Sequence, residues 1–141
     1  MSVKQISVFL ENRPGALCEL TEVLAVHDVD MRAFSLAEAS DFGIARIIVD
    51  DVYQTTTVLR DAGFVHNVSP VLAVALPDTP GGLNGILKVL SGEQINVEYM
   101  YAFLGNTPGR AYMVFRVKDP AAAEAALRRH GITPLEELEM M

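Results

Sequence analysis

The feature that most constrains this chain is an internal repeat. Residues 8–17, VFLENRPGAL, align with residues 74–83, VALPDTPGGL, at an offset of 66 positions. Farther along, after a two-residue insertion, the offset is 68, and it pairs Val49 with Val117 and Leu59 with Leu127. Because the matches keep their order and fall on the same expected elements, we interpret the chain as two copies of one unit, over 1–69 and 70–141.

Both copies give the same order of expected elements. In the first copy, apolar periodicity and turn residues predict strands over 3–10, 31–37, 44–49 and 64–68, with helices over 14–27 and 55–62. The second copy gives strands over 71–76, 95–104, 111–117 and 132–135, with helices over 81–91 and 121–130. The order βαββαβ, found twice, predicts an α+β fold of two ferredoxin-like units. Each has an antiparallel four-stranded sheet with two helices on one face.

Units of this size need cover from a neighbour. About 68 residues bury little core, and the open edges of a sheet attract other strands. The boundary at 68–70 is too short for a flexible linker, so we expect the two units to be held close. Sheet edges and apolar side chains such as Tyr99, Tyr101 and Phe103 would remain to be covered. We therefore predict at least a homodimer.

Composition excludes several classes of function. The chain carries 18 acidic and 11 basic residues and a net charge of −7, so it would repel the phosphates of a nucleic acid. It has no apolar run approaching about 18 residues and no signal-peptide pattern at its N-terminus, so no membrane partner is expected. A single cysteine, Cys18, gives neither an internal disulfide nor a metal cluster. These observations predict a cytoplasmic protein without a metal or cofactor.

The most informative motif is the junction between the first strand and the first helix of each copy, 12–17 and 78–83. Backbone N–H groups at a helix start are unsatisfied and lie at the positive end of the helix dipole. Glycine lets a ligand approach the backbone, so this junction suits a small anion such as an α-carboxylate. An ordinary helix start is the alternative, with Pro14 at the first helical position and Asn12, Asp78 or Thr79 as the cap.

A second feature is the polar residue at the start of the second strand of each copy, within 29–31 and 95–97. Asp30 and Asn96 can accept hydrogen bonds from an ammonium group, and Asn96 can also donate to a carboxylate. The alternative is a simple helix-to-strand turn, where these residue types are common.

Together these motifs resemble the ACT domain. The pattern is a strand, then (Asn/Asp)-x-Pro-Gly-x-Leu opening a helix, then Ile-Asn-Val, 95–97, at the next strand. The resemblance covers both copies and is closest to small stand-alone tandem-ACT proteins with no enzyme attached. It implies a ferredoxin-like fold that binds an amino acid at interfaces between ACT units. The Pro-Gly loop would contact the ligand, helped by a strand of a neighbouring unit.

By position, the resemblance implies a set of ligand-binding residues in each copy. Those of the two loops are Asn12, Arg13, Pro14, Gly15, Ala16 and Leu17, and Asp78, Thr79, Pro80, Gly81, Gly82 and Leu83. Those on the strand side are Asp30, Met31, Asn96 and Val97. The differences between the copies include Asp30, Arg13 and Ala16 in the first, where the second has Asn96, Thr79 and Gly82. We therefore do not expect the ligand to occupy the two sites equally.

Other functions fit less well. The segment 109–115 resembles the aromatic strand of an RNA-recognition module, but the first copy lacks the aromatic residues and the chain is acidic. Acylphosphatase shares the topology but needs an arginine-bearing anion cradle, and no such loop is present. The three histidines, His27, His66 and His130, form no catalytic or metal-binding spacing, and Cys18 is expected to pack. We therefore expect no enzyme activity.

The sequence predicts a non-catalytic sensor or regulatory protein that binds a small amino acid between ACT units. The alternative is an interaction protein that regulates or stabilises an enzyme of amino-acid metabolism in trans, without binding a ligand itself. The residues name neither the amino acid nor the enzyme.

Overall fold

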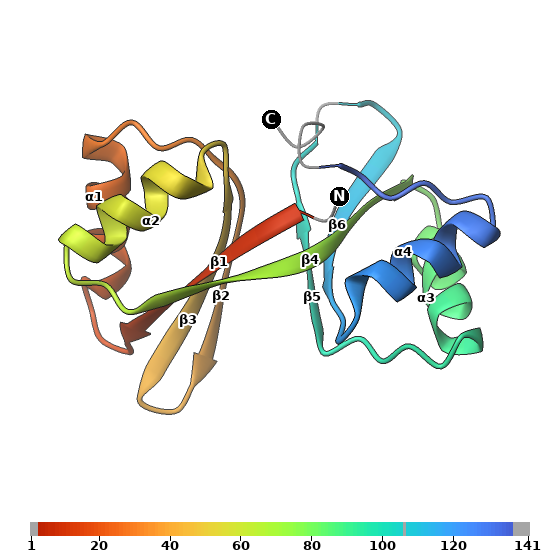
Figure 1. Ribbon diagram of the computed structural model, residues 1–141, viewed down its shortest axis with the longest axis horizontal. Coiled ribbons are helices and arrows are strands. Elements are labelled where there is room, and N and C mark those ends of the chain that lie inside the picture. Colours follow the sequence, from red (N-terminus) through yellow and green to blue (C-terminus); the bar gives the residue numbers. More distant parts are fainter. Residues whose placement is uncertain (1–2, 106, 137–141) are drawn as a thin grey trace. The chain divides into compact units, whose positions relative to one another are not determined.

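The computed structural model describes residues 3–105 and 107–136 (Figure 1). The described residues divide into two compact units, one formed by Lys4–Ser69 and the other by Val3 and residues 70–136. Among the described residues, no helix is both long enough and apolar enough to cross a bilayer.

The first unit is a sheet in the order β2-β3-β1-β4 with two helices. Strand β3 lies between β1 and β2 and runs antiparallel to both, so that Leu10 is opposite Gly43 and Leu36 is opposite Ala45. The connection from β1 to β2 carries α1, which gives the split βαβ arrangement expected from the sequence. The elements are β1 (Val3–Glu11), α1 (Ala16–Val26), β2 (Met31–Ala39), β3 (Phe42–Val49), α2 (Val52–Asp61) and the beginning of β4 (His66–Pro77).

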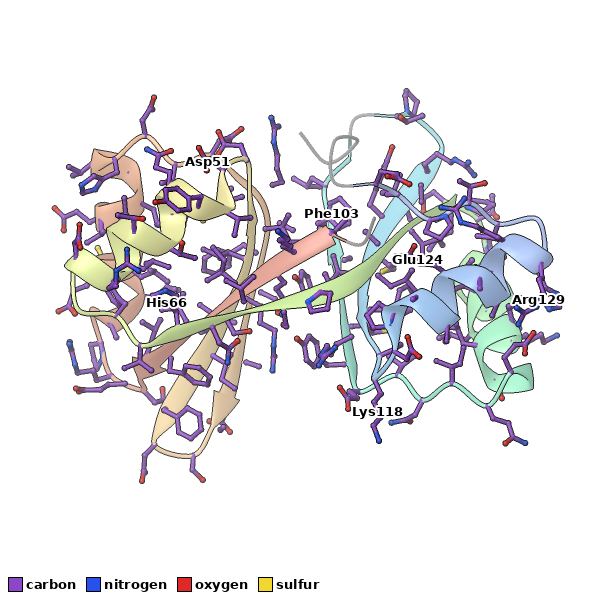
Figure 2. The ribbon with its side chains drawn as sticks, viewed as in Figure 1. Asp51, His66, Phe103, Lys118, Glu124 and Arg129 are labelled. Atoms are coloured by element: carbon purple, nitrogen blue, oxygen red, sulfur yellow. The ribbon has the colours of Figure 1, made fainter. Side chains whose placement is uncertain are left out.

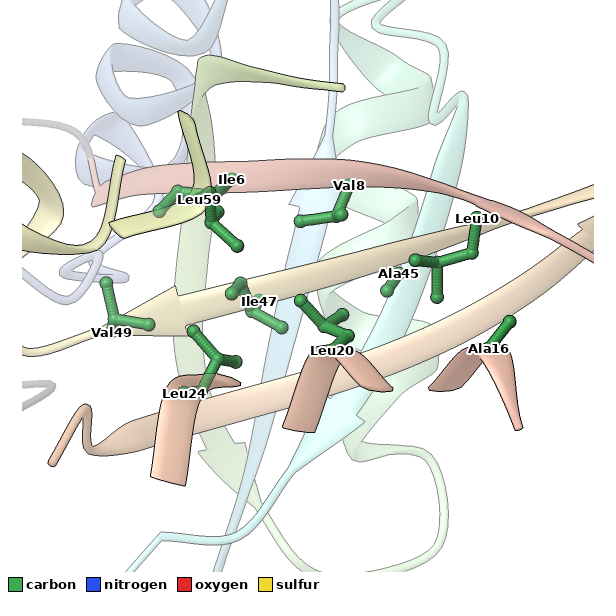
Figure 3. Packing of buried hydrophobic residues seen from close by; sticks show 10 residues of the cluster. All are labelled: Ile6, Val8, Leu10, Ala16, Leu20, Leu24, Ala45, Ile47, Val49 and Leu59. Carbon is green, nitrogen blue, oxygen red and sulfur yellow. The ribbon is translucent and has the colours of Figure 1, made fainter. Parts of the chain in front are cut away.

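The core of this unit lies between the sheet and α1. Ala16, Leu20 and Leu24 are spaced four residues apart, so they form one stripe along the helix. Figure 3 shows this stripe facing alternate residues of β1 and β3, among them Leu10 and Ala45. All of these side chains are buried. Because the stripe begins at Ala16, the packing fixes the start of the helix beside the end of β1.

The second unit repeats the plan with three strands in the order β4-β6-β5. The remaining elements are α3 (Gly82–Gly92), β5 (Tyr99–Phe103), β6 (Arg110–Arg116) and α4 (Pro120–Arg129). Ile86 and Leu90 of α3 pack against Leu72, Val74 and Leu76, which alternate along β4. The two units confirm the predicted α+β fold of two βαββαβ-like units with four helices.

Some predicted strands differ from the observed ones. The strands expected over 64–68 and 71–76 are one continuous strand, β4, because Pro70 has a φ that extended backbone accommodates. The strand expected over 132–135 is absent from the described elements, although the Leu135 N–H donates to the Ala73 carbonyl at 2.8 Å. Pro134 interrupts that segment and has no N–H to donate to a ladder.

Strand β5 is also shorter than predicted. It begins at Tyr99, and residues 95–98 before it are irregular. Tyr99, Tyr101 and Phe103 are half-buried and not fully exposed. The Phe103 ring instead packs on the ring of Tyr112, with centroids 5.4 Å apart.

Candidate functional site

Each strand-to-helix junction ends in a glycine with left-handed backbone. Gly15 precedes α1 with φ +88°, and Gly81 precedes α3 with φ +86°. Residues with a Cβ avoid this region, which explains the Gly in both copies. Pro14 lies before this glycine and outside the helix, so the prediction that it takes the first helical position is wrong.

The two junction helices have no side-chain cap, whereas the other two helices do. No side chain caps the start of α1 or of α3. At α2, Asp51 Oδ1 accepts from the Gln54 N–H at 3.0 Å, and Asp119 does the same for the Ala122 N–H of α4 at 3.1 Å. Figure 2 labels Asp51 at the start of α2. In both units, therefore, the helix without a side-chain cap is the one that follows the Pro-Gly loop.

The predicted alternative, in which polar residues of the loops cap the helices, is therefore wrong. The Asn12 side chain is used elsewhere, because its Nδ2 donates to the Ser40 carbonyl at 3.1 Å and its backbone N–H donates to the Asp41 carbonyl at 3.0 Å. These bonds tie the first loop to the turn between β2 and β3. The first N–H of each junction helix is bonded within its own loop, from Ala16 to the Arg13 carbonyl at 3.3 Å and from Gly82 to the Thr79 carbonyl at 3.0 Å.

Arg13 is clamped by two carboxylates. Its Nε donates to Glu11 Oε2 at 3.0 Å, and its NH2 donates to Glu19 Oε2 at 2.9 Å. The hydrogen bond to Glu19 and, to a smaller extent, the one to Glu11 raise the pKa of the Arg13 guanidinium above its ordinary value. The clamp joins the end of β1 to the first turn of α1 and neutralises Arg13 locally.

A cavity of about 80 Å³ lies beside this first junction. It contains four of the predicted ligand-binding residues, Asn12, Arg13, Ala16 and Leu17; Pro14 and Gly15 are not among its lining residues. The rest of the lining comes from the sheet, namely Leu10 and Glu11 of β1, Leu36, Ala37 and Glu38 of β2, and Gly43 of β3.

Sequence reasoning missed the contribution of β2 and β3 to this cavity. The strand register explains this contribution. Gly43 of β3 is paired with Leu10 of β1 on one side and with Glu38 of β2 on the other, so all three residues lie beside the cavity. The available signal was the alternation of Phe34, Leu36 and Glu38, which places the three side chains on the face of the sheet that carries α1.

The strand-side residues of the first unit lie away from its loop. Asp30 and Met31 follow the C-terminal end of α1, whereas the loop precedes its N-terminal end. The 11 residues of α1 span about 16 Å, so the unit does not bring the two sets together. Asp30 forms an ion pair with Arg32, in which the two side-chain atoms are 3.1 Å apart.

The second junction has a different construction. The Asp78 N–H donates to the Gly109 carbonyl at 2.9 Å, and the Gly82 N–H donates to the Thr79 carbonyl at 3.0 Å. Thr79, Pro80 and Gly81 are exposed, and Leu83 packs against the core. A Cβ at Gly82 would collide with the Pro77 carbonyl oxygen, so only glycine fits there.

The strand-side residues of the second unit are separated from its loop in the same way. Asn96 and Val97 follow the C-terminal end of α3, whose 11 residues separate them from the loop. In each unit, therefore, the loop and the strand-side candidates lie at opposite ends of the same helix.

Comparisons with known proteins identify the family. A family model described as ACT domain pair matches residues 1–141. Among solved structures, the chain is similar to protein BT0572 from Bacteroides thetaiotaomicron, with 36% identity and a TM-score of 0.92 over 99% of this chain and 96% of that one. A search of the curated proteins finds no match.

Two more distant structures share the fold. The regulatory subunit of aspartate kinase from Thermus thermophilus is 15% identical, with a TM-score of 0.69 over 93% of this chain and 92% of that one. The corresponding subunit from Thermus flavus is 19% identical, with a TM-score of 0.64 over 91% and 90%. Because the family model spans the whole chain and both units have the expected fold, the resemblance found in the two Pro-Gly motifs is confirmed, and the chain belongs to the ACT domain pair family.

Proposed function

We propose that this protein is a non-catalytic sensor that binds a small amino acid between ACT units, with one ACT domain over 1–69 and a second over 70–141. The observation that carries the proposal is the contrast among the four helices. The two helices that follow Pro-Gly loops begin without a side-chain cap, and the other two are capped by aspartate.

An uncapped helix start favours an anion. Its first backbone N–H groups lack acceptors within the helix, and the helix dipole places positive potential there. The first N–H of each junction helix is already bonded within its loop, so an α-carboxylate would accept from the N–H groups that follow it. Gly15 or Gly81 leaves the backbone accessible to that carboxylate. The same arrangement in both units supports two carboxylate-binding junctions.

The strand-side candidates need a second unit to reach a ligand that is bound on a loop. The loop and the strand-side candidates of one unit lie at opposite ends of its helix. A ligand on a loop would therefore meet Asp30 and Met31, or Asn96 and Val97, only if another ACT unit supplies them. This requirement supports binding between units, and it supports a homodimer as the working assembly.

A regulatory role is supported by what the chain is similar to. Both Thermus structures are regulatory subunits of aspartate kinase, and they match this chain over nearly its whole length. The second candidate function, regulation or stabilisation of an amino-acid-metabolism enzyme in trans without a ligand, is favoured by the Arg13 clamp. That clamp already gives one loop cation two carboxylate partners.

Thermal denaturation against each of the twenty amino acids tests the proposal. At about 100 times its dissociation constant, a ligand specific for the folded state adds about 2.7 kcal/mol of stability and raises Tm. Sodium acetate at the same concentration controls for binding of any carboxylate. Stabilisation by one or a few amino acids, but not by acetate, supports the sensor. An unchanged Tm with all twenty contradicts it and favours the trans-acting function.

A further inference from the structure

The two junctions are not chemically equivalent on the sheet side. In the first unit, Glu38 is paired with Gly43, and Gly43 is paired with Leu10. In the second unit, Leu76 corresponds to Leu10 and is paired with Ala111. Phe103 is paired with Tyr112, and the strands are antiparallel, so the next residue after Phe103, Leu104, lies opposite Ala111. Glu38 of the first unit therefore corresponds to Leu104 of the second, so an aliphatic side chain takes the place of a carboxylate.

The cavity beside the first junction is large enough for part of a small ligand. Its volume of about 80 Å³ is several times the roughly 10–15 Å³ that one water molecule needs. Leu10, Ala16, Leu17 and Leu36 supply aliphatic walls. Such walls favour an aliphatic group over water, since burial removes its apolar surface from solvent.

The charges that line this cavity leave one carboxylate uncompensated. Arg13 is neutralised by Glu11 and Glu19, with which it forms two ion pairs. Glu38 forms no ion pair or hydrogen bond with another side chain in the described part of the chain, and it is exposed at the cavity. A carboxylate in this state attracts an ammonium group, and a charge-assisted hydrogen bond is stronger than a neutral one.

We propose that Glu38 determines specificity at the first junction. Its carboxylate binds the ammonium group of an amino acid whose small aliphatic side chain occupies the 80 Å³ cavity. This inference rests on the proposed amino-acid binding and goes beyond it by naming the ligand class and the selecting residue. At the corresponding position of the second junction, Leu104 is 96% exposed and offers no charge.

The test compares ligands that differ only in the group that Glu38 recognises. L-Alanine and L-valine are compared with (S)-lactate and (S)-2-hydroxy-3-methylbutanoate, which keep the carboxylate and side chain but carry a hydroxyl group for the ammonium. Each is titrated into the full chain while backbone amide signals are followed by NMR. The Ala37 and Gly43 amides report on the first cavity, and the Gly81 and Gly109 amides report on the second junction.

In the unmodified chain, we expect the first-cavity amides to report at least about tenfold tighter binding of the amino acid than of its hydroxy acid. Glu38→Gln should weaken amino-acid binding by about tenfold and leave hydroxy-acid binding nearly unchanged. Glu22→Gln is the matched control, since it removes an exposed carboxylate from the same unit away from this cavity. That variant should behave like the unmodified chain.

Three outcomes would overturn this inference. The first is equal binding of the amino acids and hydroxy acids, and the second is amino-acid binding that Glu38→Gln does not weaken. The third is binding at the first cavity confined to amino acids with charged or aromatic side chains. Each of these leaves the sensor function in place, because an amino acid still binds. The absence of any response to all twenty amino acids removes the sensor function and this inference together.

Discussion

At the scale of single residues, Gly82 and Gly85 form a sharp pair for testing how the second junction is packed. A Cβ at Gly82 would collide with the Pro77 carbonyl oxygen and would lie 3.2 Å from Leu76 Cδ1. A Cβ at Gly85 would meet no atom within 4 Å. We expect Gly82→Ala to lower the free energy of unfolding by about 1–3 kcal/mol through overpacking.

Gly85→Ala should instead raise the free energy of unfolding by about 0.5–1 kcal/mol, because alanine favours a helix interior. Urea unfolding followed by circular dichroism measures both changes. Equal effects of the two substitutions would contradict the close packing of α3 on the end of β4. The first unit already carries the larger residue here, Ala16, whose side chain is 5% exposed and belongs to the core.

Asn96 tests the strand side of the proposed site. Asn96 is exposed, so Asn96→Leu should leave folding intact while removing a polar partner for the ligand. We expect amino-acid affinity to fall by about 1–3 kcal/mol. Asp30→Leu should cost less binding, because Asp30 is already engaged by Arg32 at 3.1 Å. Calorimetry with the amino acid that most raises Tm measures both, and unchanged affinity in Asn96→Leu would remove that residue from the site.

The loops show what single residues reveal from sequence alone. The Pro-Gly motif predicted both helix starts to within two residues, because the glycine that its turn needs is a local signal. The side chains around it were not predictable in the same way. Asn12 was a candidate cap, yet it bonds to Ser40, which is 28 positions away and comes close only through the sheet. Glu38 was missed because its role depends on strand register.

At the scale of elements, one ion pair links the C-terminal ends of the two helices of the second unit. Arg129 NH2 donates to Glu93 Oε1 at 2.9 Å, and His130 Nε2 lies 3.8 Å from the same oxygen. Figure 2 labels Arg129 at the end of α4. The hydrogen bond from Arg129 is the main cause that lowers the pKa of Glu93 below its ordinary value of 4.5.

This lowered pKa fixes the direction of a pH effect. A carboxyl group with a lowered pKa in the folded state contributes stability at pH values above its unfolded pKa, and it loses that contribution as the pH falls through the folded value. We expect Arg129→Ala to lower the free energy of unfolding at neutral pH and to make little difference well below pH 4.5. Urea unfolding at several pH values measures this dependence.

Arg128→Ala is the matched control for this pair. Arg128 belongs to the same helix and lies next to Arg129, but it pairs with Glu136 at the longer distance of 3.8 Å. The control carries the same change of charge and helix propensity. A pH dependence shared by both variants would show that general charge, not the contact with Glu93, is responsible.

Elements were predictable to the extent that their signals are local. Apolar periodicity, turn residues and the internal repeat predicted all four helices and most of the strands. The two strands expected on either side of Pro70 are one strand, because extended backbone accepts the φ of proline and β4 continues through it. The division between the two units still falls between residues 69 and 70, as expected. The last expected strand failed for the related reason that Pro134 has no N–H group to donate.

At the scale of the whole molecule, the remaining prediction is self-association. Strand β2 lies at the edge of the first unit's sheet and is 9 residues long. Its side chains include Met31 and Leu36, which are 37% and 51% exposed. Unpaired backbone groups beside exposed apolar side chains form a surface to which another strand can add. This edge provides a better reason for a homodimer than the half-buried aromatic residues first considered.

We expect light scattering at micromolar concentration, without added amino acid, to give twice the mass of one chain. Met31→Lys should shift the population toward the monomer, because a lysine on an edge strand opposes strand addition. Leu104→Lys makes a comparable apolar-to-charged change at a residue that is 96% exposed outside β2, so it should leave the dimer intact. A monomer mass for the unmodified chain would contradict the dimer. Equal dissociation in both variants would place the interface away from β2, because only one of the two substitutions lies on that edge.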